Sequence, residues 1–379
     1  MLAPGEAQIQ AQSSVPRLGP VLGPVLGPVL GIESSCDETA AAVLDSEGNI
    51  LAESVLSQSE HAKFGGVVPE LAARAHLQHL PAMVEDVMRQ AGLSYGDLAA
   101  AAGTTGPGLI GGLIVGSGMA RGIAIGAGIP FIAINHLEAH ALSPRLPALR
   151  PEFGAEFPYL LLLVSGGHCQ CVAVEGIGRY RRLGTTIDDA VGEAFDKVGK
   201  MLGLGWPGGP AVERLAADGD RTRFPLPRPM LGRPGCDFSF SGLKTAVANK
   251  LTAYPPRQVP RDIAADIAAA FQHSVTEVMA DRVAHALDMM PQARMLVIAG
   301  GVAANKAIRA RLDTLAEKRG VHLLAPPLRL CTDNAVMVAW AALERLRLGA
   351  TSPIGFACKP RWPLDSANMR IGEPESASA

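Results

Sequence analysis

The sequence predicts a two-lobed α/β protein that binds its ligand between the lobes. At 379 residues the chain is longer than one ordinary domain, and its 48% hydrophobic residues are enough to build two cores. Residues 29–92 are typical of three short strands followed by a helix, and the same order recurs in residues 159–203. Because related lobes bind ligands where their strand-end loops face each other, we expect an interlobe cleft.

The first 28 residues differ in composition from the rest of the chain. Residues 19–30 repeat GPVL three times, after a lead that contains a single acid (Glu6) and a single base (Arg17). Proline at every fourth position prevents a helical signal segment, and no basic stretch precedes it. We therefore expect residues 1–28 to be a disordered extension rather than a signal peptide.

The first repeat unit begins at Val29. Its three strand-like runs are separated by brief turns, which favours an antiparallel meander: VLGIESS, TAAAVLDS and NILAESVLS. A helix follows over residues 65–92, and Pro81 marks a kink or a break in it. Residues 109–134 come nearest to a membrane span, but they contain Arg121, Pro130 and seven glycines. This segment is more typical of a glycine-rich turn, a closely packed helix and a strand.

Residues 131–140, FIAINHLEAH, contain the strongest chemical signal. An apolar run typical of a buried strand ends at Asn135, and His136 and His140 follow it, four residues apart. On a helix this spacing places both imidazoles on one face, one turn apart, as two ligands of a divalent metal require. Two histidines leave such a site incomplete, so a third ligand, a carboxylate, is expected from elsewhere.

The second repeat unit contains a glycine turn after its first strand, at Ser165-Gly166-Gly167. Gly300-Gly301 repeats the device before a predicted helix, whose N-terminus favours phosphate. Without side chains, these turns let backbone N–H groups approach an anionic or planar ligand. Neither turn matches GxGxxG or the Walker A pattern, so a Rossmann or P-loop site is not indicated.

Three carboxylates lie near these turns in the sequence. Asp196 precedes WPGGP and is a candidate ribose ligand, although helix-surface pairing with neighbouring charges also explains it. Glu213, four residues after Gly209, is a second candidate. Asp333 is explained either as the N-cap of a long apolar helix or as the missing third metal ligand.

Charge and cysteine content narrow the functional class. The net charge of −2 argues against coating nucleic acid through overall charge, so any nucleic-acid partner needs a local patch. Four arginines in residues 221–233 and three in residues 179–182 are candidates, although a solvated surface explains them equally well. The six cysteines form no CxxC pair, which indicates reduced thiols and a cytoplasmic setting.

A series of motifs, in order from about Val29 to about Leu364, resembles the TsaD/Gcp family of tRNA N6-adenosine threonylcarbamoyltransferases. The set is specific although PGGP or LVSGG alone is not: GIESSCDETA, FGGVVPELAARAH, INHLEAH, LVSGGH, DDAVGEAFDKVGKMLG, PGGP, DFSFSGLKTA, GGVAANKAIR, CTDNA and KPRWPL. The resemblance implies an actin-like, sugar-kinase/Hsp70 (ASKHA) fold with duplicated ribonuclease H-like units. It also implies transfer of threonylcarbamoyl from threonylcarbamoyl-AMP to N6 of adenosine 37, in tRNAs that read codons beginning with A. Residues 1–28 have no counterpart in the family pattern.

Carried over by position, the resemblance assigns one divalent metal, iron in preference to zinc, to His136, His140 and Asp333. It assigns the adenylate to a larger set of residues: Leu163, Val164, Ser165, Gly166, Gly167, Asp196, Gly209, Glu213 and Asn305. The implied partners are tRNA, a TsaB-like paralogue and a TsaE-like ATPase, with no membrane. The expected lobes are 29–142 plus 335–365 and 143–334, followed by a flexible tail, 366–379.

Several alternatives remain at this point. AMP is a good leaving group, so no protein nucleophile is needed, but the general base is unknown, with Asp37, Glu38 and His168 as candidates. A zinc metalloendopeptidase is unlike this sequence, because HExxH places the glutamate directly after the first histidine, whereas Glu138 lies two residues on. A non-catalytic actin-like nucleotide-binding scaffold would keep the glycine turns but have no use for the His/His/Asp set.

Overall fold

The structure is a computed structural model, which describes residues 26–64, 66–147, 154–255 and 258–367. Most of the predicted extension (1–28) and most of the predicted tail (366–379) lie outside the described residues. The disordered extension and the flexible tail therefore stay predictions. The expected lobe boundaries stay predictions as well.

The first sheet contains five strands in the order β3-β2-β1-β4-β5. The predicted meander is its antiparallel part, and the last two strands continue it in parallel. Its strands are β1 (Val29–Glu33), β2 (Glu38–Leu44), β3 (Ile50–Ser57), β4 (Ala100–Gly106) and β5 (Phe131–Asn135). Every residue of β1, β4 and β5 is buried, as expected of near-continuous apolar strands in a sheet that is covered on both faces.

The second sheet repeats this order as β8-β7-β6-β9-β10. Again three antiparallel strands are followed by two parallel ones, so β6 corresponds to β1 and β9 to β4. Its strands are β6 (Tyr159–Val164), β7 (Cys169–Gly176), β8 (Arg179–Thr185), β9 (Met295–Ala299) and β10 (His322–Leu324). The duplication predicted from the sequence is therefore present in the topology.

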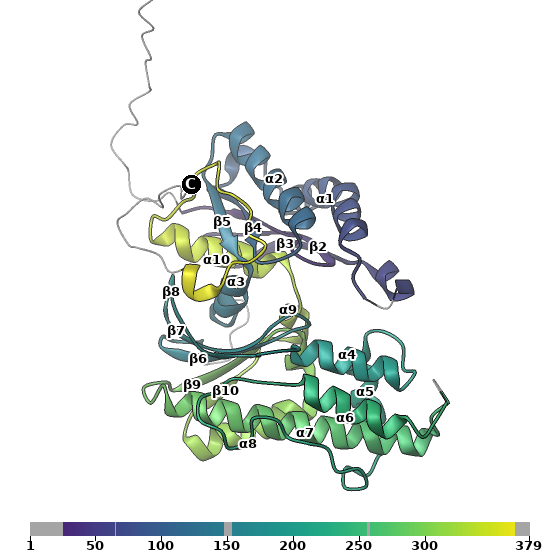
Figure 1. Ribbon diagram of the computed structural model, residues 1–379. Helices are drawn as coiled ribbons and strands as arrows, with labels where there is room; N and C mark the ends of the chain where they lie inside the picture. The colour runs from purple at the N-terminus through teal and green to yellow at the C-terminus, as the bar shows by residue number, and fades with distance from the viewer. Residues whose placement is uncertain (1–25, 65, 148–153, 256–257, 368–379) are drawn as a thin grey trace, which may run out of the picture.

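Helices separate and cover the two sheets (Figure 1). On one face of the first sheet lie α1 (Pro69–Ala91) and α2 (Ile110–Ala127), and on its other face lie α3 (His136–Leu142) and α10 (Ala335–Arg347). The outer face of the second sheet carries α4 (Val191–Met201), α5 (Gly208–Ala216), α6 (Ser241–Leu251), α7 (Arg261–Asp288) and α8 (Lys306–Arg319). Short helical segments complete the described chain: Ser59–Phe64, Tyr95–Asp97, Ser143–Arg145, Gly301–Ala304, α9 (Leu328–Cys331) and Leu364–Ala367.

The short helix α3 lies between the two sheets (Figure 1). Ala139 and Leu142 belong to the core formed with α10 under the first sheet. Leu137 and Ala141 belong to the core on the inner face of the second sheet. All seven residues of α3 are buried, so the two predicted metal-binding histidines sit at the junction of both lobes.

Helix α2 has the length and apolar composition to cross a membrane, and a third of it is buried. It packs closely on β4, where a Cβ at Gly103 would meet the Ala120 Cβ at 3.2 Å. It also approaches the end of β1, because a Cβ at Gly112 would lie 2.1 Å from the Ser34 carbonyl oxygen. These contacts match the predicted glycine-rich, closely packed helix, and its neighbour α1 runs through Pro81 without a break.

Candidate metal centre

Asn135 at the end of β5 fixes the start of α3. Its side-chain oxygen accepts the backbone N–H of Leu137 at 2.9 Å, which is the usual N-cap arrangement. Its amide nitrogen donates to the Trp362 carbonyl at 3.0 Å, so the cap is itself held by the C-terminal segment. The buried strand and the capped helix therefore place His136 and His140 in fixed positions, as the sequence predicted.

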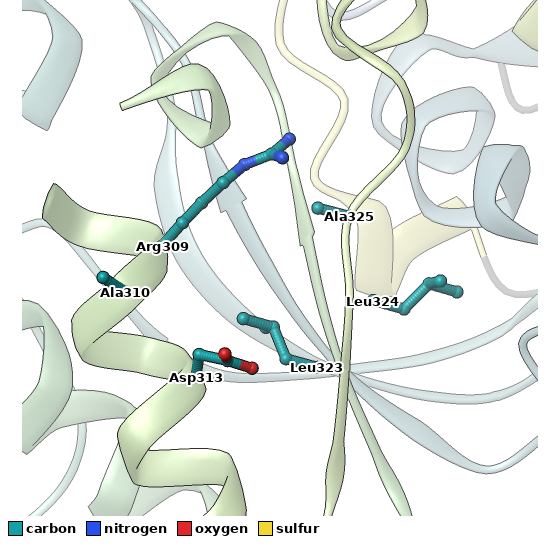
Figure 2. A pocket seen from close by; sticks show the side chains of 6 residues that line it. All are labelled: Arg309, Ala310, Asp313, Leu323, Leu324 and Ala325. Carbon is teal, nitrogen blue, oxygen red and sulfur yellow. The ribbon is translucent and has the colours of Figure 1, made fainter. Parts of the chain in front are cut away.

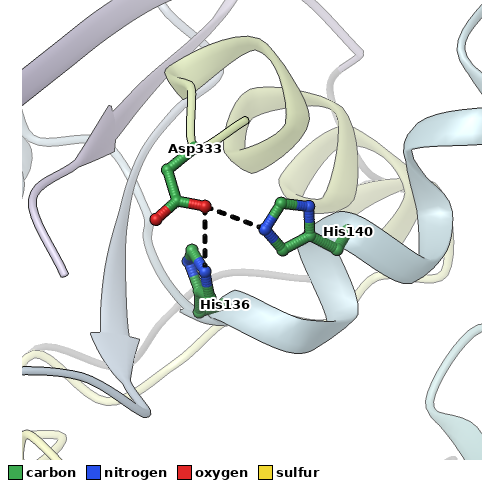
Figure 3. A group of neighbouring side chains, drawn as sticks. All are labelled: His136, His140 and Asp333. Carbon is green, nitrogen blue, oxygen red and sulfur yellow. Dashed lines mark hydrogen bonds and ion pairs between the residues drawn. The ribbon is translucent and has the colours of Figure 1, made fainter. Parts of the chain in front are cut away.

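The third member of the cluster comes from the segment between α9 and α10. Asp333 Oδ1 lies 3.0 Å from His140 Nε2 and 3.4 Å from His136 Nε2 (Figure 3). One donor atom from each of the three residues lies within 4.8 Å of the others, which fits a shared metal ion. Two imidazoles and one carboxylate form a donor set that suits Fe²⁺ or Zn²⁺.

Opposite charges stabilise the cluster of His136, His140 and Asp333. Burial opposes the charged form of His136, but the carboxylates of Asp333 and Glu33 outweigh it and raise the pKa of His136 well above its usual range. Burial likewise opposes the charge of Asp333, but His136 and His140 hold its pKa well below its usual range. A positive charge is therefore favoured at this position, and either a proton or a metal ion supplies it.

Two residues at the end of β1, Glu33 within the strand and Ser35 just after it, orient His136, and sequence analysis missed both. Glu33 Oε2 lies 3.1 Å and Ser35 Oγ 3.2 Å from His136 Nδ1, so Nε2 is left to face Asp333. A carboxylate behind a histidine is the usual second layer of a metal site, because it fixes the tautomer and the ring orientation. The buried Nδ1 of His140 has no hydrogen-bond partner among the described residues. The signal for Glu33 was its charge in a strand that is otherwise apolar.

Asp333 is not the N-cap of α10. The next residue, Asn334, takes that position, and its side-chain oxygen accepts the Met337 N–H at 2.9 Å. The N-cap explanation of Asp333 was therefore wrong, and its carboxylate is free to join the histidines.

The two glycine turns lie side by side because β6 and β9 are parallel neighbours. A Cβ on Gly300 would lie 2.3 Å from the Val164 carbonyl oxygen, and the φ of Gly300 is +94°, so glycine is required there. By contrast, a Cβ on Gly166, Gly167 or Gly301 would meet nothing within 4 Å. The backbone at these three positions is thus accessible to a ligand.

The sequence suggested that the second glycine turn, Gly300-Gly301, leads directly into a helix. In the structure it does not. A short 3₁₀ segment, Gly301–Ala304, comes first, and α8 begins only after Asn305. Asn305 caps α8 by accepting the Ile308 N–H at 3.0 Å, and it donates to Gln272 Oε1 at 2.9 Å. The predicted phosphate-favouring helix start is displaced from the glycines by this turn.

The remaining predicted nucleotide ligands lie in two pairs. Asp196 contacts Gly209, and Glu213 contacts the residue that follows Asn305. Asp196 Oδ1 accepts the N–H groups of Gly208 at 2.8 Å and Gly209 at 3.4 Å, at the start of α5. Burial raises the pKa of Asp196, and the charge of Asp37 adds to this. Glu213 Oε1 accepts the Lys306 N–H at 2.7 Å, beside Asn305.

The candidate general bases differ in their proton affinity. Burial, with help from Asp333 and Asp37, raises the pKa of Glu38 to about 9, so its carboxyl is protonated at neutral pH. A cation on the histidine cluster would lower this value. Burial and the nearby histidines lower the pKa of His168 to about 4, so its imidazole is neutral and a weak base.

Comparison with known proteins decides the family. The family model for TsaD, tRNA N6-adenosine threonylcarbamoyltransferase, matches residues 49–340. A tRNA N6-adenosine threonylcarbamoyltransferase of Granulibacter bethesdensis is 65% identical over 355 residues, 92% of this chain and 95% of that protein. A second, of Gluconobacter oxydans, is 62% identical over 338 residues, 88% of this chain and 92% of that protein. The chain belongs to the TsaD family.

The resemblance read from the motifs and the predicted enzyme class, a tRNA threonylcarbamoyltransferase, are thereby confirmed. Among solved structures, HypF of T. kodakarensis aligns with a TM-score of 0.56 at 14% identity, over 86% of this chain and 48% of that chain. This likeness concerns the fold alone. Together with the duplicated sheets and the family membership, it confirms the predicted ASKHA class.

The metalloendopeptidase alternative fails on the position of Glu138. This carboxylate is fully buried and pairs with Arg345 at 2.7 Å, on the side of α3 away from the histidine cluster. It therefore has no access to a metal-bound water, which is the function of the HExxH glutamate. Family membership points to the same conclusion.

Several of the candidate tRNA-binding arginines are engaged within the protein. Arg223 pairs with Asp266 at 2.7 Å, and Arg181 pairs with Glu175 at 3.4 Å. Arg228 lies 3.0 Å from His273 Nε2, and Arg221 contributes with it to the lowered pKa of His273, after burial. The arginine-rich loop is thus partly an internal anchor, and Arg221 and Arg233, whose side chains make no hydrogen bond or ion pair with the described residues, are its better candidates for phosphate contacts.

A pocket of about 340 Å³ lies between α8 and β10 (Figure 2). Its polar lining residues are Arg309 and Asp313, and Leu323 and Leu324 supply apolar surface. Arg309 donates to the Ala303 carbonyl and thereby holds the 3₁₀ turn after Gly300. The pocket contains none of the predicted metal or nucleotide ligands.

Proposed function

We propose that this chain transfers the threonylcarbamoyl group from threonylcarbamoyl-AMP to N6 of adenosine 37, in tRNAs reading codons that begin with A. One observation carries the proposal: a His/His/Asp cluster lies at the junction of two lobes, with accessible glycine turns on the neighbouring strand ends. The cluster supports a metal-assisted reaction, and the turns support binding of an adenylate.

His136, His140 and Asp333 would hold one divalent metal ion per chain. We favour Fe²⁺ over Zn²⁺, because two histidines and one carboxylate that leave positions open are typical of non-haem Fe²⁺ sites. A bound ion supplies a Lewis acid for the carbamoyl oxygen or a ligand for the threonyl carboxylate. Glu33 and Ser35 keep the His136 ring turned toward that position.

The adenylate would lie against the turn at Leu163–Gly167, with further contacts from Asp196, Gly209, Glu213 and Asn305. Exposed backbone at Gly166 and Gly167 supports close approach of the ligand. The carboxylates of Asp196 and Glu213 already accept backbone N–H groups, and each has a second oxygen with which to reach a ribose hydroxyl.

In the reaction the N6 amine attacks the carbamoyl carbon, the bond to the AMP phosphate oxygen breaks, and the amine loses a proton. The phosphate is a good leaving group, so the protein mainly positions the two substrates. The raised pKa of Glu38 and the lowered pKa of His168 weigh against both as bases. We therefore favour Asp37, which lies near Asp196.

A tRNA substrate follows from the family, and we propose a TsaB-like paralogue and a TsaE-like ATPase as cytoplasmic partners. Large apolar side chains are exposed on α1 and α2, with Leu77 at 66%, Ile114 at 57% and Ile125 at 69% accessibility. An exposed apolar surface of this kind supports a protein partner on these helices.

The proposal is tested by transfer of labelled threonine to an ANN-decoding tRNA, with ATP, bicarbonate and the accessory proteins present. We expect label on adenosine 37 with the wild type, a loss of at least about a hundredfold with His140→Ala, and little change with the control His285→Ala on α7. Label unaffected by His140→Ala would remove the metal assignment. No label with the wild type would favour the nucleotide-binding scaffold.

A further inference from the structure

Glu138 lies between the two histidines of α3, yet it has no part in the cluster they form. A helix turns by about 100° per residue, so His136 and His140 lie about 40° apart, and Glu138 lies opposite their midpoint. Its carboxylate is completely buried. A charged group is kept in such a place only when partners hold it.

Two partners from different elements hold this carboxylate. Arg345 Nη2 of α10 lies 2.7 Å from Glu138 Oε2, and Arg345 Nη1 donates to the Ala133 carbonyl of β5 at 3.3 Å. Tyr180 Oη of β8 donates to Glu138 Oε1 at 2.9 Å. The first contact ties α3 to the first lobe, and the second ties it to the sheet of the second lobe.

These contacts restrict rotation of α3 about its own axis. The helix has only seven residues, and the Asn135 cap holds its first turn. A buried carboxylate paired with a buried guanidinium leaves its position only at high cost. Because Glu138 is fixed on one side, both imidazoles are fixed on the other.

We propose that Glu138 is a positioning residue, which aligns His136 and His140 toward Asp333 and makes their alignment depend on Tyr180 of the second lobe. The inference rests on the proposed metal site. It assigns the glutamate of HLEAH a role in holding the metal ligands, at a distance from the substrate.

The test is Co²⁺ binding to the purified full-length chain, followed by chelator competition and by the visible absorption of the bound ion. Glu138→Gln keeps the shape and the hydrogen bond from Tyr180 but removes the charge that holds Arg345. We expect Co²⁺ affinity to fall about tenfold to a hundredfold, with an altered absorption spectrum, because changes behind metal ligands have effects of this size.

Glu344→Gln is the matched control. Glu344 is also a buried carboxylate, it precedes Arg345 on α10, and it lies 2.8 Å from Arg145. Its replacement removes a comparable ion pair, so the melting temperature should fall similarly while Co²⁺ affinity and absorption stay at wild-type values. Equal losses of Co²⁺ affinity in both variants would show a general loss of stability and overturn the inference.

Tyr180→Phe keeps the inference testable if Glu138→Gln does not fold. It removes one hydroxyl and should weaken Co²⁺ binding severalfold, and a folded Tyr180→Phe protein with wild-type affinity and absorption would refute the link to the second lobe. A wild type that binds no Co²⁺ would overturn the metal site itself. If wild type and folded Glu138→Gln bind Co²⁺ with the same affinity and the same absorption spectrum, only the role of Glu138 is overturned.

Discussion

The ends of β1 and β6, with the loops that follow them, occupy equivalent positions in the duplicated fold, yet they differ in chemistry. Glu33, the last residue of β1, carries a carboxylate that accepts hydrogen bonds from the Thr104 hydroxyl and the Ser35 N–H, both at 2.6 Å, and faces His136 at 3.1 Å. After β6, Gly166 and Gly167 leave open space. The end of β1 thus orients protein side chains, and the loop after β6 leaves room for a ligand.

This difference shows how a duplicated framework acquires two functions at one junction. Both turns lie at the ends of buried central strands, so both are held rigidly. Rigid strand ends favour a site, whether its occupant is a metal held by side chains or an adenylate held by backbone. The comparison can be tested from each side.

The largest expected effect comes from removing the carboxylate at the end of β1. Glu33→Gln takes away the charged partner of His136 Nδ1, so the imidazole loses both its orientation and its basicity. We expect the affinity for Co²⁺ to fall about tenfold to a hundredfold in chelator competition. Glu47→Gln, in the turn after β2, is the control, and an unchanged affinity in Glu33→Gln would contradict the assigned role of this strand end.

The second expected effect comes from adding a side chain to the loop after β6. Gly166→Ala meets no neighbour, so the free energy of unfolding should change by less than about 0.5 kcal/mol. Binding of a non-hydrolysable threonylcarbamoyl-adenylate analogue should weaken at least about tenfold by calorimetry, because the methyl group occupies the ligand's approach. Gly355→Ala, also in open space, should leave both quantities unchanged. Wild-type affinity in Gly166→Ala would place the adenylate elsewhere.

The smallest expected effect concerns His168, at the end of the loop after β6. Its folded pKa of about 4 lies below the unfolded value of 6.5, so between these pH values the unfolded chain binds more protons. Stability should therefore be complete above pH 6.5 and fall as the pH drops toward 4. His168→Gln should reduce the loss between pH 7.5 and pH 5 by about 2 kcal/mol in urea unfolding.

His79→Gln, on α1, provides the control for a lost imidazole. If the free energy of unfolding falls equally in wild type and His168→Gln over this pH range, burial does not keep His168 neutral in the loop after β6.

Much of this architecture could be predicted because it depends on local patterns. Apolar runs and turns identified the strand meander, and the four-residue spacing of His136 and His140 identified the face of α3. What could not be predicted depends on distant partners. Arg223 pairs with Asp266, 43 residues away, and nothing in the sequence distinguishes this anchor from a free arginine.

Adjacent polar residues were a second source of error. Asp333 and Asn334 are both good N-cap residues, and only the backbone geometry shows that Asn334 takes the cap. Similarly, Gly300-Gly301 predicted a tight turn, but the pattern did not show the extra 3₁₀ segment before α8. The metal and nucleotide ligands themselves remain proposals, which the experiments above test.

The position of α3 between the two sheets also bears on how the protein is made. His140 and Asp333 are 193 residues apart in the chain, so a ribosome releases the histidines long before the aspartate. A nascent chain that ends before Asp333 contains two of the three donors and cannot close the site. The ability to retain a metal ion should therefore arise late in synthesis, once the second sheet has formed and α10 has returned to the first, so metal retention would report completed assembly of both lobes.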